Sequence, residues 1–175
     1  MPLIKTVSHE EAEGQIKQVY DMMAAMAGSV PKPLQLLSVS PKIFDVNMQA
    51  LQYYFQHPNL SANLLAAIRF VSATHCEYPY CIDMNKKILT NMAGMSEDQV
   101  AQLLKDPEGL DMPEKDRAML TFVKNALKAP EDVQQEDVDK LRDLGWLDSD
   151  IFEAVNHGAF MVAGGILFNT FKMGI

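Results

Sequence analysis

Residues 61–94, SANLLAAIRFVSATHCEYPYCIDMNKKILTNMAG, decide the fold. Ser61 is a favourable N-cap residue, and apolar residues follow it at helical spacing at Leu64, Leu65, Ile68 and Val71. This pattern predicts a helix that ends near Thr74. Pro79 suits the first position of a second helix, which we expect to continue through Ile82, Lys86, Leu89 and Met92 and to end at Gly94. The stretch therefore predicts two helices joined by a short turn.

Similar start and stop signals recur on both sides of this stretch. Capping-box patterns pair Ser8 with Glu11 and Ser96 with Gln99, and they predict a helix start at each place. Ser40-Pro41 and Pro113 predict two more starts, and Asp148 or Ser149 can cap a last helix. No run alternates with the period of two that a strand needs. We therefore predict an all-α protein, a bundle of about eight helices forming one domain over residues 1–175.

Composition and charge limit the function classes. Lys and Arg number 15 against 23 Asp and Glu, a net charge of −8 that repels phosphate backbones and anionic lipids. We expect no nucleic acid and no membrane partner. The N-terminal segment reaches Glu10 and Glu11 before any long apolar stretch, so we expect a cytoplasmic protein. The uncharged run 154–171 contains His157, two asparagines and three glycines, and we interpret it as a buried helix.

The segment 75–85 holds the densest group of reactive side chains, namely His75, Cys76, Glu77, Cys81, Asp83 and Asn85. If Pro79 begins the helix, Cys81 lies in its first turn, where free amides and the helix dipole favour a thiolate. We therefore predict that Cys81 is the more acidic thiol. Cys76 precedes the turn at Pro79, and we predict that the two cysteines form a disulfide under oxidising conditions.

Other interpretations of these residues stay open. Two cysteines are also common as inert core residues, and His75, Cys76 and Cys81 supply too few ligands for a typical zinc site, so we expect no metal and no cofactor. His157 lies on the most apolar helix, where a pocket role competes with that of an ordinary core histidine. His75, Glu77, Asn85 and His157 are the candidate proton-relay or pocket residues.

The chain resembles the alkylhydroperoxidase D-like and carboxymuconolactone decarboxylase proteins, especially their peroxidase-related branch. The similarity covers most of the chain and includes residues 60–73, DRAMLTF at 116–122, EDVDKLRDLGW at 136–146 and DIFEAV at 150–155. It implies an all-α fold and homo-oligomers. It also implies thiol peroxidase activity, an antioxidant function, in members that keep the full redox motif.

That motif consists of a Glu, then Cys-x-x-Cys, then a His four residues after the second Cys. Cys81 matches the second, peroxide-attacking Cys, whereas Tyr78 occupies the position of the first and Asn85 that of the His. The Glu position falls on Leu64 or Ala66. The nearest other thiol is Cys76.

The resemblance thus implies a thiol oxidoreductase that reduces hydroperoxides through Cys81, with Cys76 resolving and a thiol reductant protein as partner. The alternative is a relative of the same fold that binds a small ligand or a partner without redox chemistry. A decarboxylase of the carboxymuconolactone type is the third interpretation, for which Arg69, His75 and His157 are the candidates to surround a carboxylate.

Overall fold

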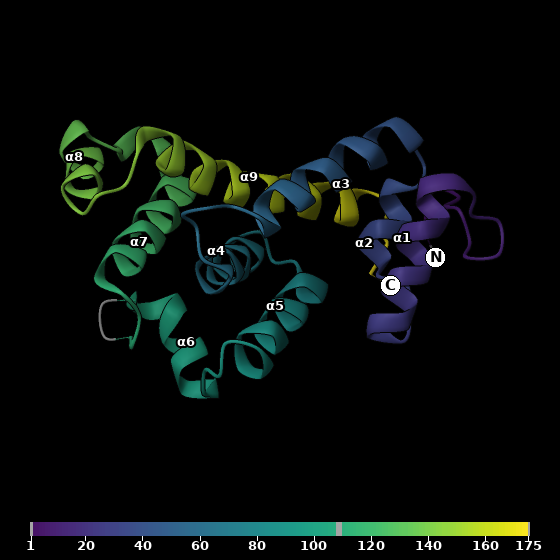
Figure 1. Cartoon of the computed structure of the whole chain (residues 1–175), viewed down its shortest axis with the longest axis horizontal. Coiled ribbons are helices and arrows are strands. Elements are labelled where there is room, and N and C mark those ends of the chain that lie inside the picture. The colour runs from purple at the N-terminus through teal and green to yellow at the C-terminus, as the bar shows by residue number, and fades with distance from the viewer. Residues whose placement is uncertain (1, 108–109, 175) are drawn as a thin grey trace. The chain divides into compact units, whose positions relative to one another are not determined.

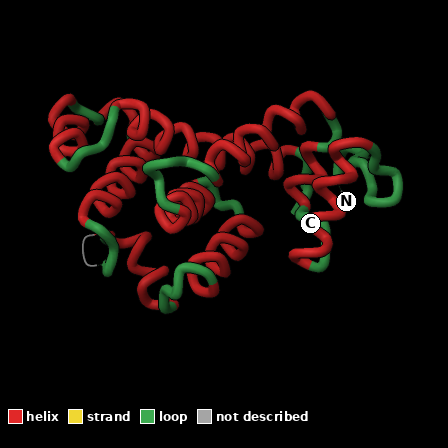
Figure 2. The backbone as a smooth tube through the Cα atoms, in the orientation of Figure 1, coloured by secondary structure: helices red, strands yellow, loops and turns green. Residues whose placement is uncertain are grey.

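The computed structural model describes residues 2–107 and 110–174, and it confirms the all-α prediction (Figures 1 and 2). Within these residues it contains nine α-helices and no strand. The elements are α1 (Gly14–Ala27), α2 (Lys32–Leu37), α3 (Pro41–Phe55), α4 (Ala62–His75), α5 (Pro79–Asn91), α6 (Glu97–Lys105), α7 (Glu114–Lys128), η2 (Pro130–Asp132), α8 (Gln135–Asp143) and α9 (Asp148–Thr170).

The backbone divides into two compact units, one of residues 1–56 with 166–175 and one of residues 57–165. The first unit contains α1, α2 and α3. The second contains α4 to α8 and most of α9. The single domain over residues 1–175 stays a prediction.

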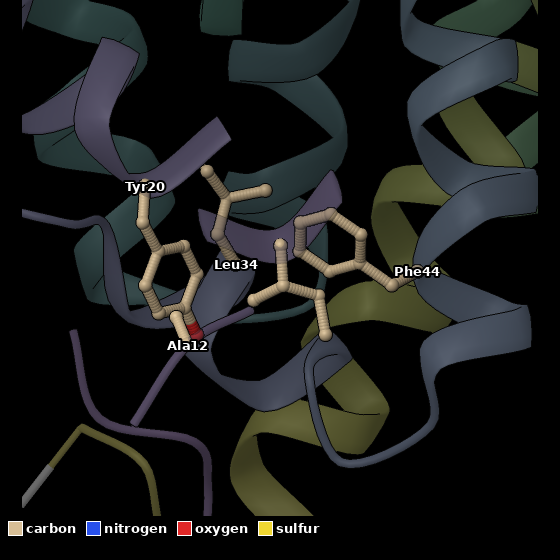
Figure 3. Close-up of a cluster of buried hydrophobic side chains, with 5 residues drawn as sticks. Ala12, Tyr20, Leu34 and Phe44 are labelled. Atoms are coloured by element: carbon tan, nitrogen blue, oxygen red, sulfur yellow. The ribbon is translucent and has the colours of Figure 1, made fainter. Parts of the chain in front are cut away.

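The first unit has its own small core (Figure 3). Tyr20 of α1 and Phe44 of α3 are fully buried, and their rings meet edge to face with centroids 6.4 Å apart. The Tyr20 hydroxyl donates a hydrogen bond of 3.3 Å to the Val7 carbonyl, so the aromatic pair also fixes the N-terminal segment. Ala12, Ile16 and Leu34 complete the buried cluster.

The second unit is built around α4, which lies among α5, α6 and α7 (Figure 1). Nine of its residues are buried, from Leu64 to Ala73. Helix α9 packs close to it, because a Cβ placed on Gly158 would lie 3.1 Å from Ser72 Oγ of α4 and 2.8 Å from Leu127 of α7. The unit therefore encloses α4 on several sides, as its apolar sequence predicts.

Most of the predicted helix starts are confirmed. The Ser61 hydroxyl accepts a 3.1 Å hydrogen bond from the Leu64 amide, as an N-cap does, and Ser96 with Gln99 forms the complete capping box of α6. Pro79 is the first residue of α5. These signals work because they satisfy amides that the helix itself leaves unpaired.

The predicted helix start at Ser8 is wrong, although its hydrogen bonds form. The Glu11 amide donates to the Ser8 hydroxyl over 3.2 Å, and the Ser8 amide donates to the Glu11 carboxylate over 3.4 Å. These bonds close a turn, and α1 begins only at Gly14, whose φ of +55° lies in the left-handed region. The interior of a right-handed helix does not contain such a residue. The turn closed by Ser8 and Glu11 is therefore separate from α1 and does not cap it.

Helix α9 is the one helix of the described residues with the length and hydropathy of a membrane span, a property that core helices share. Only a third of its most apolar window is buried. Ala154, His157 and Gly158 are buried, whereas Phe152 and Phe160 are 71% and 43% exposed. The expectation of a buried helix therefore holds for one face of α9.

Candidate functional site

Cys81 lies at the third position of α5, as predicted, but its side chain points into the protein. It is 3% exposed, and on the same face of α5 Asn85 and Leu89 are fully buried. Of the residues expected along this helix, Leu89 is buried, Ile82 and Lys86 are partly buried, and Met92 is 81% exposed. The first turn of α5 directs the thiol toward α4, away from solvent.

Tyr78 contacts this thiol directly. It is the N-cap residue of α5 and is 2% exposed, and its side chain hydrogen-bonds to Cys81. A phenol donates to a thiolate and thereby stabilises it. The tyrosine at the position of the family's first cysteine is therefore part of the site, a role that the sequence analysis did not assign to it.

Arg69 of α4 is the charged group of the site. Its Nε donates to Asn85 Oδ1 over 3.0 Å, and its Nη1 lies 3.2 Å from His157 Nε2 on α9. Among the described residues no carboxylate pairs with Arg69, so both of its partners are neutral. Burial lowers the pKa of Arg69 to about 10, and a nearby Cys81 thiolate raises it in part. The guanidinium therefore stays charged at neutral pH.

Asn85 and His157, both predicted as pocket or relay residues, are thus brought together by Arg69. Since a guanidinium only donates hydrogen bonds, His157 Nε2 must accept, which places the ring proton on Nδ1. The Leu65 backbone hydrogen-bonds to the same ring. Burial, and then the charge of Arg69, lower the pKa of His157 to about 3. The ring is therefore neutral and serves as an acceptor, with its basic lone pair already engaged.

The prediction that Cys81 is the more acidic thiol is wrong. Burial raises the pKa of Cys81 to about 11, against the opposing effects of the Tyr78 hydrogen bond and the Arg69 charge. Burial also raises the pKa of Cys76, by less, because that residue is only partly buried. A helix dipole contributes at most about 1 kcal/mol, less than one pKa unit. The loss of hydration at Cys81 exceeds it.

Cys76 and Cys81 are both free, and the structure does not bring their thiols together. The Cys76 thiol donates to the Ala73 carbonyl over 3.5 Å at the end of α4. It also lies against α9, because a Cβ on Gly165 would be 2.8 Å from its Sγ. The predicted disulfide is therefore absent from this conformation.

His75 and Glu77, the other two candidates for proton transfer, are exposed near the α4–α5 turn. Glu77 has a φ of +48°, a left-handed conformation that is unusual for a residue with a side chain. Burial separates these two residues from Cys81, which is enclosed. The structure thus groups Cys81 with Tyr78, Arg69, Asn85 and His157, and it leaves His75 and Glu77 at the surface.

A second polar cluster, of His57, Asp150 and Glu153, has the composition of a metal site. However, His57 Nδ1 accepts hydrogen bonds from the amides of Leu60 and Asn59, at 2.9 and 3.1 Å. The proton of a neutral ring must then be on Nε2, which lies 2.6 Å from Glu153. A ligating His57 would have to release that proton, so the cluster fits a hydrogen bond between the 57–60 loop and α9 better than a metal.

One groove of the second unit lies apart from these residues. It is lined by α7, η2 and α8, including Phe122, Asn125, Lys128 and Leu141. None of the candidate site residues lines it.

Comparisons with known proteins bear on the fold. No model of a protein family matches the chain, and no curated protein does. Solved structures match it over nearly its whole length. A peroxidase-related protein from Ralstonia eutropha JMP134, described as an alkylhydroperoxidase AhpD core, has a TM-score of 0.80 at 22% identity and covers 98% of this chain and 90% of its own.

Two further structures agree. A peroxidase-related protein from Silicibacter sp. TM1040 has a TM-score of 0.79 at 16% identity, over 98% of this chain and 92% of its own. A protein of unknown function from Agrobacterium tumefaciens has a TM-score of 0.63 at 20% identity, over 78% of this chain and 92% of its own. At these identities the likeness concerns the fold. The chain therefore has the AhpD-like fold of these peroxidase-related proteins.

Proposed function

We propose that this chain is a thiol-dependent oxidoreductase that reduces hydroperoxides, with Cys81 as the sulfur that attacks the peroxide. The observation that carries the proposal is the environment of that thiol. Cys81 accepts a hydrogen bond from the Tyr78 side chain and lies in the electrostatic field of Arg69. Among the residues described, Arg69 has no carboxylate partner. A hydroxyl donor and a guanidinium are the groups that stabilise a thiolate.

The reaction begins from the thiolate. Its sulfur attacks one peroxide oxygen, an S–O bond forms, the O–O bond breaks, and the leaving alkoxide takes a proton from water to become an alcohol. The sulfur is oxidised by two electrons to a sulfenic acid, and the peroxide is reduced by the same two electrons. The Cys76 thiol then attacks the sulfenic sulfur, a disulfide forms and water leaves. An external dithiol reduces that disulfide and restores both thiols.

Resolution by Cys76 requires the turn between α4 and α5 to rearrange. The turn contains Glu77 in its left-handed conformation, which costs roughly 1–2 kcal/mol for a residue with a side chain. Relaxation of Glu77 would release this strain as the turn moves. An external thiol that attacks the sulfenic acid directly is the other route, and the Cys76→Ser variant separates the two.

The site provides no strong general base. His157 is neutral with its lone pair on Arg69, and Asn85 is an amide. The proton of Cys81 therefore leaves to water or hydroxide. The pKa of Cys81 is about 11, so at lower pH only a small fraction of this residue is thiolate. That fraction increases about tenfold for each unit by which the pH rises toward 11. We expect slow turnover at neutral pH and a steep rise toward alkaline pH.

The test measures consumption of an organic hydroperoxide with dithiothreitol as reductant, between pH 7 and pH 10. The wild type should consume peroxide with a rate that rises with pH, and Cys81→Ser should abolish it. Cys76→Ser, treated with peroxide in the absence of dithiothreitol, should react once and then accumulate a sulfenic acid that dimedone traps. A wild-type rate equal to that of Cys81→Ser at every pH would refute the proposal.

A second candidate function is the binding of a small carboxylate without redox chemistry. The same guanidinium favours it, because Arg69 is held by neutral acceptors and can pair with an external anion. The high pKa of Cys81 agrees with it as well. Cys81→Ser would then bind carboxylates as the wild type does, measured by thermal stabilisation, whereas Arg69→Met would not.

We also propose a homo-oligomer. Large apolar side chains are exposed on the Met-rich helix α1, where Met22 and Met26 are 51% and 76% exposed, and on α9, where Phe152 is 71% exposed. Single exposed apolar residues are ordinary, but α9 carries no charged side chain from residue 154 to residue 170. Light scattering at micromolar concentration should give a mass above 19.6 kDa.

A further inference from the structure

The neutrality of the groups around Arg69 is the feature that the proposed function does not explain. A guanidinium taken from water into a protein interior is ordinarily paired with a carboxylate, because an uncompensated buried charge costs several kcal/mol. Here its two acceptors are an amide oxygen, at 3.0 Å, and an imidazole nitrogen, at 3.2 Å. Both fix the direction of the guanidinium, and neither reduces its charge.

Asn85 is itself held in the orientation that this requires. Its side chain is fully buried, and its Nδ2 donates to the Cys81 carbonyl over 2.8 Å, one turn back along α5. Because the amide nitrogen is committed to that carbonyl, Oδ1 must face Arg69. Asn85 thereby links the backbone that carries the reactive thiol to the cation that stabilises it.

His157 holds the guanidinium from α9. The ring can accept from Arg69 only in its Nδ1-protonated form. It is 5% exposed and lies beside Gly158, where α9 approaches α4 closely. Two helices thus supply the two acceptors, and neither contributes a negative charge.

We infer that Asn85 and His157 are positioning residues that hold Arg69 in place without neutralising it, so that its charge is available to the Cys81 thiolate. The inference rests on the proposed function only in naming that thiolate as the anion. A carboxylate at either position would form an ion pair with Arg69 and remove its effect on the thiol. The acidity of Cys81 would then fall.

The test uses Cys76→Ser as the reference chain, so that Cys81 is the single thiol. The rate of alkylation by iodoacetamide is measured from pH 7 to pH 11 in the reference and with Asn85→Asp added. We expect Asn85→Asp to slow the reaction at pH 8 by about threefold to tenfold and to move the profile toward higher pH. The matched control is Asn91→Asp, which adds the same charge at an exposed position of α5. It should stay within twofold of the reference.

His157→Glu adds a carboxylate on the other side of Arg69. If Asn85→Asp does not fold, the same alkylation measurement is made on His157→Glu. We expect the same direction of change. A folded Asn85→Asp or His157→Glu variant that alkylates with the reference profile would overturn the inference, as would an equal slowing in Asn91→Asp. Alkylation requires no peroxide, so a failure to reduce hydroperoxides would refute the proposed function and leave this result standing.

Discussion

The buried histidine makes the stability of this protein sensitive to acid by an amount that can be worked out. The pKa of His157 lies at about 3 in the folded chain, against an ordinary value of 6.5. Since the folded value is the lower one, the neutral ring contributes stability above pH 6.5, and that contribution is lost as the pH falls toward 3. A difference of about 3.5 units corresponds to about 5 kcal/mol.

The assay is urea unfolding of the wild type and of His157→Gln at several pH values between 7 and 4.5. Glutamine keeps a neutral acceptor for Arg69 but takes up no proton in this range. As the pH is lowered from 6 to 4.5, we expect the free energy of unfolding of the wild type to fall more steeply than that of His157→Gln. The difference in slope should be about 1.4 kcal/mol per pH unit, the value for one proton that only the unfolded chain binds.

His75→Gln is the matched control, because it removes an exposed histidine and leaves the Arg69 contact intact. Its unfolding free energy should follow that of the wild type more closely than that of His157→Gln. Equal slopes for wild type and His157→Gln would refute the reasoning, since they would mean that the folded chain protonates His157 as readily as the unfolded chain does.

Two further predictions concern packing and capping. Gly165→Ala should destabilise the fold by about 1–3 kcal/mol in urea unfolding, because the added Cβ would lie 2.8 Å from Cys76 Sγ, whereas Gly164→Ala meets nothing within 4 Å and should be neutral or slightly stabilising. Ser61→Ala should cost about 1–2 kcal/mol, since the hydroxyl caps α4 and donates to Asp116 over 3.1 Å, and Ser8→Ala should cost less because its turn precedes α1. Equal losses within either pair would contradict these assignments.

The helices could be predicted well from local signals, and the exceptions have a local cause. Ser61, Pro79 and the Ser96–Gln99 pair mark true helix starts because they satisfy the first amides of the helix that follows. Ser8 and Glu11 form the same hydrogen bonds, yet the backbone at Gly14 turns left-handed and delays the helix. That conformation depends on how the segment packs against the first unit's core, through contacts such as Tyr20 with Val7. A capping pattern does not contain this information.

The site was harder to predict because it depends on which face of α5 meets α4. The position of Cys81 in the first turn was correct, but the expected acidity assumed an exposed thiol, and burial changes the sign of the effect. Arg69, the one Lys or Arg of α4, was considered only as a partner for a carboxylate substrate, and its connection with α5 was missed. A lone buried cation requires acceptors, and Asn85 is the polar residue of α5 that lies one turn after Cys81. Pairing Arg69 with Asn85 would have placed Cys81 on the buried face of α5, since residues four apart share a face of a helix.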